Sequence, residues 1–259
     1  MINYIRSEVY RNLRSKGNYL FIIGLMAFAV FLNVALWLFV KSDANFPYAT
    51  TKYAFSSIYS SLQLLMIISS FTVSLILGEE YKNKTLKNTI SFGVSRSSIY
   101  FSKLLISVIY SLIAGILVCG TFIITAYLLL ENSGGEYIKI LINSLIIAAP
   151  IFLFCITLTN SLYFIMDKEM NVSMVWIITV IVIPQLLAMI GRRNEIFNLI
   201  ASYMPWNIVG DVSFNEVTKK LVLGWMTPEG VFKSVIVSII GCLIFYFIGL
   251  EMFKKKEIK

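Results

Sequence analysis

The side chains that most enzymes use for catalysis are scarce in this sequence. Its 259 residues include no histidine, which excludes Ser-His nucleophiles, histidine-ligated zinc and histidine proton shuttles. The dipeptide Gly-Lys never occurs, so the chain has no P-loop with which to hold a nucleoside triphosphate. The three cysteines, Cys119, Cys155 and Cys242, form no Cys-x-x-Cys pair and indicate neither a metal site nor a disulfide framework. The sequence therefore predicts a non-catalytic chain that binds no cofactor of its own.

The charged residues that could recognise a partner are concentrated between Gly78 and Lys103. This segment opens with Glu79 and Glu80; because no histidine accompanies them, they do not indicate an intramembrane metalloprotease. Charged side chains are unfavourable in hydrocarbon, so the segment must face water. Two interpretations follow: it docks a soluble protein, or it is a polybasic loop that touches anionic lipid. The bases of the segment are Lys82, Lys84, Lys87, Arg96 and Lys103.

Local signals predict a short helix and a tight return within this segment. Glu80 and Lys84 stand four residues apart, in the order that stabilises a helix. No helix breaker interrupts Thr85–Ile90, so the helix is expected to continue through it. Phe92–Gly93 is predicted to turn the chain, and Ser95 to cap the next helix.

Long uncharged windows on both sides of the segment indicate that lipid is the solvent for this chain. Apolar residues make up 58% of the sequence and charged residues only 14%, well below their share in soluble domains. A spanning helix needs about 20 apolar residues, and only helices satisfy every backbone group within one segment in hydrocarbon. We therefore predict an all-α membrane protein, a single transmembrane domain over residues 1–259 with six spanning helices. The windows are Tyr19–Val40, Tyr53–Gly78, Leu104–Leu130, Ile140–Met166, Met170–Gly191 and Ser234–Leu250.

The distribution of basic residues predicts that both termini lie in the cytoplasm. With that orientation, fourteen of the 22 lysines and arginines fall in inner segments, as the positive-inside rule favours. Segment 79–103 is then cytoplasmic, and the protein is a multi-pass component of the plasma membrane. This asymmetry accounts for the net charge of +8, so the charge does not indicate nucleic-acid binding.

Two further segments are expected to lie at the membrane surfaces. Residues 1–18 form an amphipathic pattern typical of an interfacial helix lying on the lipids of the inner leaflet. Within the outer loop 192–233, Ile196–Val209 is too short to span and too apolar to stay in water, so it is expected to be re-entrant or interfacial. The apolar face of the first helix consists of Ile2, Ile5, Val9 and Leu13, and the charged face of Glu8, Arg11 and Arg14.

The second span carries a polar face at roughly helical spacing. A glutamine facing hydrocarbon is unfavourable, so this face must be covered or hydrated. It either lines a translocation pathway or forms hydrogen bonds with neighbouring helices. The residues concerned are Ser60, Gln63, Ser70 and Ser74.

The charged segment and its flanks resemble the cytoplasmic coupling region of ABC-2 type transporter permeases. The resemblance rests on an acid at the end of the second span and on two motifs, Lys-Thr-Leu-Lys-Asn and Gly-Val-Ser-Arg-x-x-Ile-Tyr-x-x-Lys. Many family members have Gly-Thr where this chain has Lys84–Thr85. The motifs cover about a tenth of the chain, and the six-span layout extends the resemblance over the whole length. The residues that carry it are Glu79 or Glu80, Lys84, Thr85, Leu86, Ser95, Arg96, Ile99 and Lys103.

The resemblance implies that the chain works with a separate ABC ATP-binding subunit, which would use ATP and Mg. The short helix would sit in a groove on that subunit and transmit its movement to the membrane. A second permease chain, identical or related, would complete the pathway through contacts of the first and fifth spans. The implied docking residues are Glu79, Glu80, Lys82, Lys84, Thr85, Leu86, Lys87, Ile90, Phe92 and Arg96.

The cargo is less constrained by the sequence than the class of transporter. Small permeases of this composition resemble those that expel amphipathic peptides, including lantibiotics, bacitracin and cytolytic toxins. Export of ions, drugs or lipids is an alternative within the same family. Two other classes stand beside it: an ATP-independent channel or secondary transporter, and a sensory or assembly protein.

Overall fold

The computed structural model of the chain describes residues 2–43, 46–83, 86–215 and 220–256, and the side chains within these ranges except at 79–83, 215 and 220. The described residues form helices almost throughout, together with one short β-hairpin. In chain order the elements are α1 (Ile2–Arg14), α2 (Lys16–Ser42), α3 (Thr51–Tyr59), α4 (Leu62–Asn83), α5 (Leu86–Ser91), α6 (Arg96–Leu129), α7 (Glu136–Ile165), α8 (Glu169–Ile177), the π-helix η1 (Ile178–Val182), α9 (Ile183–Gly191), α10 (Glu195–Ser202), α11 (Pro205–Gly210), β1 (Val212–Asn215), β2 (Lys220–Leu223), the 3-10 turn η2 (Gly224–Met226) and α12 (Pro228–Lys255).

Within the described residues, five helices are long and apolar enough to cross a membrane: α2, α6, α7, the continuous stretch Glu169–Gly191, and α12. The pair α3 and α4 adds a sixth if it is one span bent by 62°. The prediction of an all-α membrane protein is thus confirmed. The hairpin was not predicted; it pairs Val212 with Leu223 and Asn215 with Lys220 in antiparallel register.

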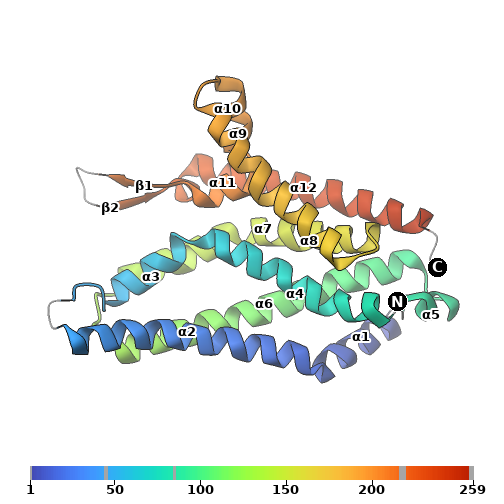
Figure 1. Ribbon diagram of the computed structural model, residues 1–259, viewed down its shortest axis with the longest axis horizontal. Helices are drawn as coiled ribbons and strands as arrows, with labels where there is room; N and C mark the ends of the chain where they lie inside the picture. Colours follow the sequence, from blue (N-terminus) through green and yellow to red (C-terminus); the bar gives the residue numbers. More distant parts are fainter. Residues whose placement is uncertain (1, 44–45, 84–85, 216–219, 257–259) are drawn as a thin grey trace.

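The spans form an elongated bundle in which α12 runs along α7 (Figure 1). Lipid tails are as apolar as the side chains, so close packing and interhelical hydrogen bonds must hold such a pair together. The Ser234 hydroxyl donates to the Ile147 carbonyl at 3.0 Å, and the Ser161 hydroxyl donates to the Phe245 carbonyl at 2.8 Å. Gly249 lets α12 approach α7 closely, because a Cβ there would stand 2.7 Å from Ser161 Cβ.

A second helix pair joins α2 to α6. The buried Asn33 amide donates to the Phe122 carbonyl at 2.9 Å and to the Thr125 hydroxyl at 2.7 Å. An asparagine inside a span is costly unless such partners are present. This contact therefore sets the register of the first span against the third.

The second span is broken although neither proline nor glycine lies at the break. α3 ends at Tyr59 and α4 begins at Leu62; between them the Ser60 hydroxyl donates to the Ser56 carbonyl at 2.6 Å. In the fifth span, the π-helix η1 ends two residues before Pro184, which has no N–H to continue the α-helical ladder.

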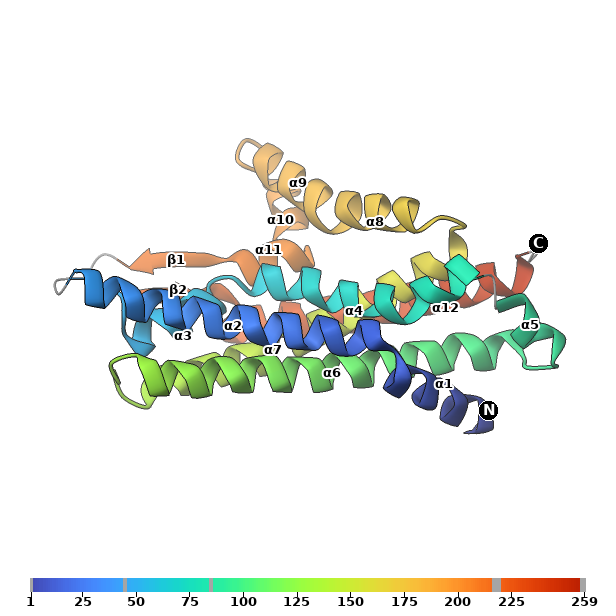
Figure 2. The same ribbon diagram turned by 60° about the horizontal axis from the view of Figure 1, so that its bottom comes forward.

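The fifth span and the segment after it stand apart from the bundle. α8, η1 and α9 diverge from the other spans in both views, and α10 folds back along α9 (Figures 1 and 2). Gly191 permits this reversal, because a Cβ there would stand 2.7 Å from the backbone of Asn198. The region predicted as one re-entrant or interfacial segment, Ile196–Val209, contains two short helices, α10 and α11.

Both chain ends and α5 lie at one end of the molecule, and the hairpin lies at the other (Figures 1 and 2). We call the first the α5 end, comprising α1, α5 and the last turn of α12. We call the second the hairpin end, comprising α3, β1 and β2. An even number of spans requires that the termini share a side, and the arrangement meets that requirement.

Candidate functional site

The turn after α5 has the predicted geometry. Gly93 has a φ of 83°, in the left-handed region that glycine adopts without strain. The Ser95 hydroxyl accepts a hydrogen bond from the Ser98 amide at 3.2 Å, which confirms Ser95 as the N-cap of α6. The helix is divided differently from the prediction, since α4 continues to Asn83 and α5 is a separate helix.

The predicted docking residues are not all presented alike. Phe92 is 86% exposed, and Lys87 is exposed as well. Leu86 and Ile90 are partly buried against the core of the bundle. Lys84 and Thr85 lie outside the described residues, as do the side chains of Glu79, Glu80 and Lys82. Of the three apolar anchors expected, only Phe92 projects fully from the α5 end.

Arg96, another predicted docking residue, lies against the end of α12. Its Nη1 donates to the carbonyls of Phe253, Lys254 and Lys256 at 2.9, 2.6 and 2.7 Å. The guanidinium also lies 5.8 Å from the centroid of the Phe253 ring. The last carbonyls of a helix lack intrahelical donors and carry partial negative charge, so a cation stabilises them. Arg96 thus ties the start of α6 to the end of α12.

Lys256 likewise donates to the last carbonyls of α7. Its Nζ donates to the carbonyls of Phe164, Ile165 and Met166 at 3.1–3.3 Å and pairs with Asp167 at 2.8 Å. The end of α7 is therefore held by the residue that follows α12. Arg96 and Lys256 together join three spans at the α5 end.

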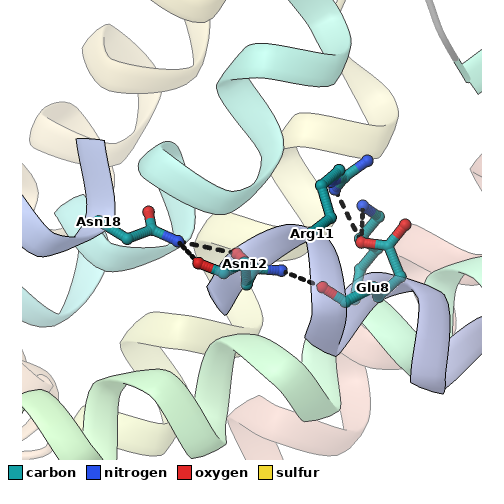
Figure 3. A network of polar contacts seen from close by, with 5 residues as sticks. Glu8, Arg11, Asn12 and Asn18 are labelled. Carbon is teal, nitrogen blue, oxygen red and sulfur yellow. Dashed lines mark hydrogen bonds and ion pairs between the residues drawn. The ribbon is translucent and has the colours of Figure 1, made fainter. Parts of the chain in front are cut away.

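A buried charge cluster fastens α1 to α6. Lys103, with no exposed side-chain surface, places Nζ 2.5 Å from Glu8 Oε2, and Arg11 Nη2 lies 2.7 Å from the same oxygen. Figure 3 shows Glu8 and Arg11 on α1. Glu8 is only 4% exposed, so its expected place on the charged, water-facing side of α1 is wrong. Burying an ionised carboxylate requires a partner, and Lys103 provides it.

The bend between α1 and α2 is held by two asparagines (Figure 3). The Asn18 amide donates to Asn12 at its backbone carbonyl, 3.2 Å, and at Oδ1, 3.0 Å. The Asn12 amide in turn donates to the Glu8 carbonyl at 2.9 Å. The Tyr110 hydroxyl, on α6, donates to the Asn18 carbonyl at 2.8 Å. α6 therefore holds α1 through Glu8, midway along that helix, and the start of α2 through Asn18.

Comparison with known families decides the class. Residues 4–185 match the model of the ABC-2 family transporter protein, which is well over half of the chain. The chain belongs to the ABC-2 transporter family. It is a permease subunit of an ABC exporter, a class of membrane subunit that is generally non-catalytic and that associates with an ABC ATP-binding subunit. No curated protein sequence matches the permease.

The span-two residues of the permease differ in what they contact. The Gln63 amide donates to the Trp206 carbonyl at 2.9 Å and so connects α4 to α11. The hydroxyls of Ser60, Ser70 and Ser74 donate to carbonyls of the same span, at Ser56, Met66 and Ser70. Gln63 thus connects two elements, and Ser74 also interacts with the Tyr163 hydroxyl on α7.

Sequence reasoning missed the intramolecular partners of the bases at the α5 end. Lys103 and Arg96 were recognised as parts of a motif, but nothing in the sequence connects them to Glu8 or to the end of α12. One signal was present: Glu8 is the only acid in residues 1–18.

Proposed function

We propose that this ABC-2 permease docks its ATP-binding subunit through α5 and the turn that follows. The observation that carries the proposal is Phe92, an aromatic side chain 86% exposed at a polar end of the molecule. Large aromatic side chains are typical anchors of protein interfaces, where a partner's pocket covers them. Lys87 on α5 is exposed beside it and supplies a charge for pairing.

The contacts behind α5 support a coupling role. Movement of the docked turn would pull on the start of α6, and Arg96 would pass that movement to α12 through three carbonyls. The buried Lys103–Glu8 pair would carry α1 along with α6. Packed elements joined in this way move as units.

The remaining assignments complete the proposal. Two permease chains enclose one pathway, and the first and fifth spans form the contact; the way α8 and α9 diverge from the bundle leaves surface for a second chain. ATP and Mg are used by the ATP-binding subunit. The α5 end faces the cytoplasm, in keeping with the positive-inside rule, and the complex lies in the plasma membrane.

We propose an amphipathic peptide as cargo, such as an antimicrobial or cytolytic peptide, moved out of the cell or the membrane. The second span offers hydroxyl and amide groups within an apolar helix, at Ser60, Gln63, Ser70 and Ser74. Such a mixed surface suits a molecule with one polar and one apolar face.

Replacing the exposed anchor tests the docking. We expect Phe92→Ser to reduce co-purification with the ATP-binding subunit, and the ATPase activity that the permease stimulates, by about tenfold, because hot-spot aromatics contribute 2 kcal/mol or more. Phe214→Ser is the matched control, since Phe214 is 60% exposed at the hairpin end. Unchanged co-purification and stimulation with the Phe92 variant would remove α5 as the docking element.

A further inference from the structure

A cavity of about 550 Å³ opens near the hairpin end of the permease, at a place that docking does not explain. Its walls come from α10, α11, η2 and the first turns of α12, and Gln63 reaches it from α4. The volume lies within the range of about 300–1,000 Å³ that small-ligand pockets have. The family match ends at residue 185, so Gln63 alone among the described lining residues falls within it.

An acid without a partner lies on the wall of this cavity. Asp211 follows α11 and is exposed. Its side chain lies against Gly224, where an added Cβ would overlap the carboxylate. The backbone of the two residues is joined by a hydrogen bond of 2.8 Å from the Gly224 amide to the Asp211 carbonyl. No described residue donates a hydrogen bond to the carboxylate or forms an ion pair with it.

Two amides on the wall donate through their nitrogens, while their oxygens accept no hydrogen bond from the described residues. Gln63 Nε2 donates to the Trp206 carbonyl at 2.9 Å. Asn207 Nδ2 donates to the carbonyls of Pro184 and Ala201 at 3.0 and 2.9 Å. Neither amide oxygen accepts a hydrogen bond from any described residue. An amide carbonyl and a carboxylate are acceptors, so these three groups together match a ligand that donates hydrogen bonds.

The one cation among the described lining residues is already committed. Lys233 Nζ lies 2.7 Å from Glu229 Oε1 and 5.1 Å from the centroid of the Tyr203 ring. Glu229 and Lys233 therefore balance each other, and Asp211 leaves the wall with an unbalanced negative charge.

We infer that the cavity binds a primary ammonium group, held by the Asp211 carboxylate and by the oxygens of Gln63 and Asn207. A calcium ion needs six to eight oxygen ligands at about 2.3–2.6 Å, and no three acidic, histidine or cysteine side chains of the described chain come together as metal ligands. Three acceptor groups, one carboxylate and two amide oxygens, match the three N–H donors of an ammonium group. The volume leaves room for the molecule that carries this group.

Two molecules could supply this group. One is a cationic peptide, through its N-terminal or lysine amine; this source rests on the proposed peptide cargo. The other is the amine of a phosphatidylethanolamine headgroup in the leaflet beside the cavity. Both would meet the same acceptors, so they are separated by experiment.

The test uses the full-length permease in nanodiscs, without its ATP-binding subunit, so failed docking cannot affect it. One probe is a fluorescent, lysine-containing amphipathic peptide, together with the same peptide acetylated at every amine, in nanodiscs of phosphatidylcholine alone. The other is phosphatidylethanolamine, supplied in equal mixture with phosphatidylcholine and quantified as lipid retained by the purified protein. We expect the acetylated peptide to bind about tenfold more weakly than the amine form.

Three variants accompany the wild type. Asp211→Asn removes the charge with little change of shape, and Gly224→Ala displaces the carboxylate while keeping its charge. Glu195→Gln is the matched control, because Glu195 is an exposed acid in the first turn of α10 that does not line the cavity. We expect both cavity variants to bind the amine-bearing probe about tenfold more weakly, and the control to bind it as the wild type does.

Loss with the peptide alone assigns the site to cargo, and loss with the lipid alone assigns it to a headgroup; either result supports an ammonium site. Equal binding of both probes by wild type, Asp211→Asn and Gly224→Ala, with unchanged thermal stability, would overturn the inference. That result would leave the proposed export function standing, since ATP-dependent transport by the complete complex is measured separately.

Discussion

At the scale of single residues, the buried ion pair of Lys103 and Glu8 should be the contact most sensitive to substitution. Both side chains are almost fully removed from solvent, and their opposite charges lie in direct contact. Removing one partner leaves an uncompensated buried charge, whereas replacing both by apolar groups removes the desolvation cost as well. Arg11 approaches the same carboxylate but is 37% exposed, so it should matter less.

This difference predicts the outcome of a double-mutant cycle. We expect Glu8→Leu alone to lower the stability of the detergent-purified protein by about 3–5 kcal/mol, because the buried Lys103 ammonium loses its ion pair with the Glu8 carboxylate. Glu8→Leu combined with Lys103→Met should recover most of that loss. Thermal unfolding followed by tryptophan fluorescence measures the series, with Arg11→Gln as the milder control. If the double variant were as unstable as the sum of the two single ones, the pair would not be coupled.

At the scale of elements, the pairing of α12 with α7 and α6 depends on Gly249. The Tyr100 hydroxyl and the Ser161 hydroxyl, 2.7 Å apart, lie directly against this glycine. A methyl group at this position would clash with the side chains of Tyr100 and Ser161, which are both buried. Gly115 and Gly120, in α6, have nothing within 4 Å of the position where a Cβ would stand.

Alanine substitution should therefore have opposite effects at the two kinds of glycine. We expect Gly249→Ala to destabilise the protein by about 1–3 kcal/mol, because helix packing must open to admit the methyl group. Gly120→Ala should be neutral or slightly stabilising, since alanine favours the helix. Melting temperatures of the two variants, purified in the same detergent, provide the comparison. Equal melting temperatures would show that α12 does not pack closely at Gly249.

The elements also show what could be read from the sequence. Five of the six predicted spans are present among the described residues, and the second corresponds to the bent pair α3 and α4. The helices run past the uncharged windows; α6 begins at Arg96 although its window begins at Leu104. Hydropathy detects where lipid ends, whereas a helix continues as long as its backbone hydrogen bonds do. No residue near Tyr59 signals the break between α3 and α4 in the sequence. A contact beside the break, from the Gln63 amide to the Trp206 carbonyl, joins residues far apart in the chain and could not be predicted. The strands of the hairpin are four residues long, too short for a reliable period-2 pattern.

At the scale of the whole molecule, the family and the α5 segment were predictable, while the connections of that segment were not. The spacing of Arg96 and Lys103 places them on the same face of α6, about two turns apart, but says nothing of α12 or α1. Those contacts join residues more than 90 positions apart, as between Lys103 and Glu8. The candidate site was thus predicted as a set of residues, and only the fold divides it into an exposed anchor, Phe92, and bases that hold the bundle together.

At the scale of the whole molecule, the proposed orientation in the membrane predicts which residues are accessible from outside the cell. With the α5 end in the cytoplasm, a cysteine at position 97, exposed at the start of α6, should react with a membrane-impermeant maleimide only after cells are permeabilised. A cysteine at position 213, exposed on β1, should react in intact cells. The physical reason is the bias of basic residues toward the α5 end, which resists transfer across the membrane. Labelling is measured in a variant in which Cys119, Cys155 and Cys242 are serine, so that only the introduced thiol reacts. The reverse pattern would place α5 outside the cell, where no ATP-binding subunit could reach it, and the proposed docking would fail with the orientation.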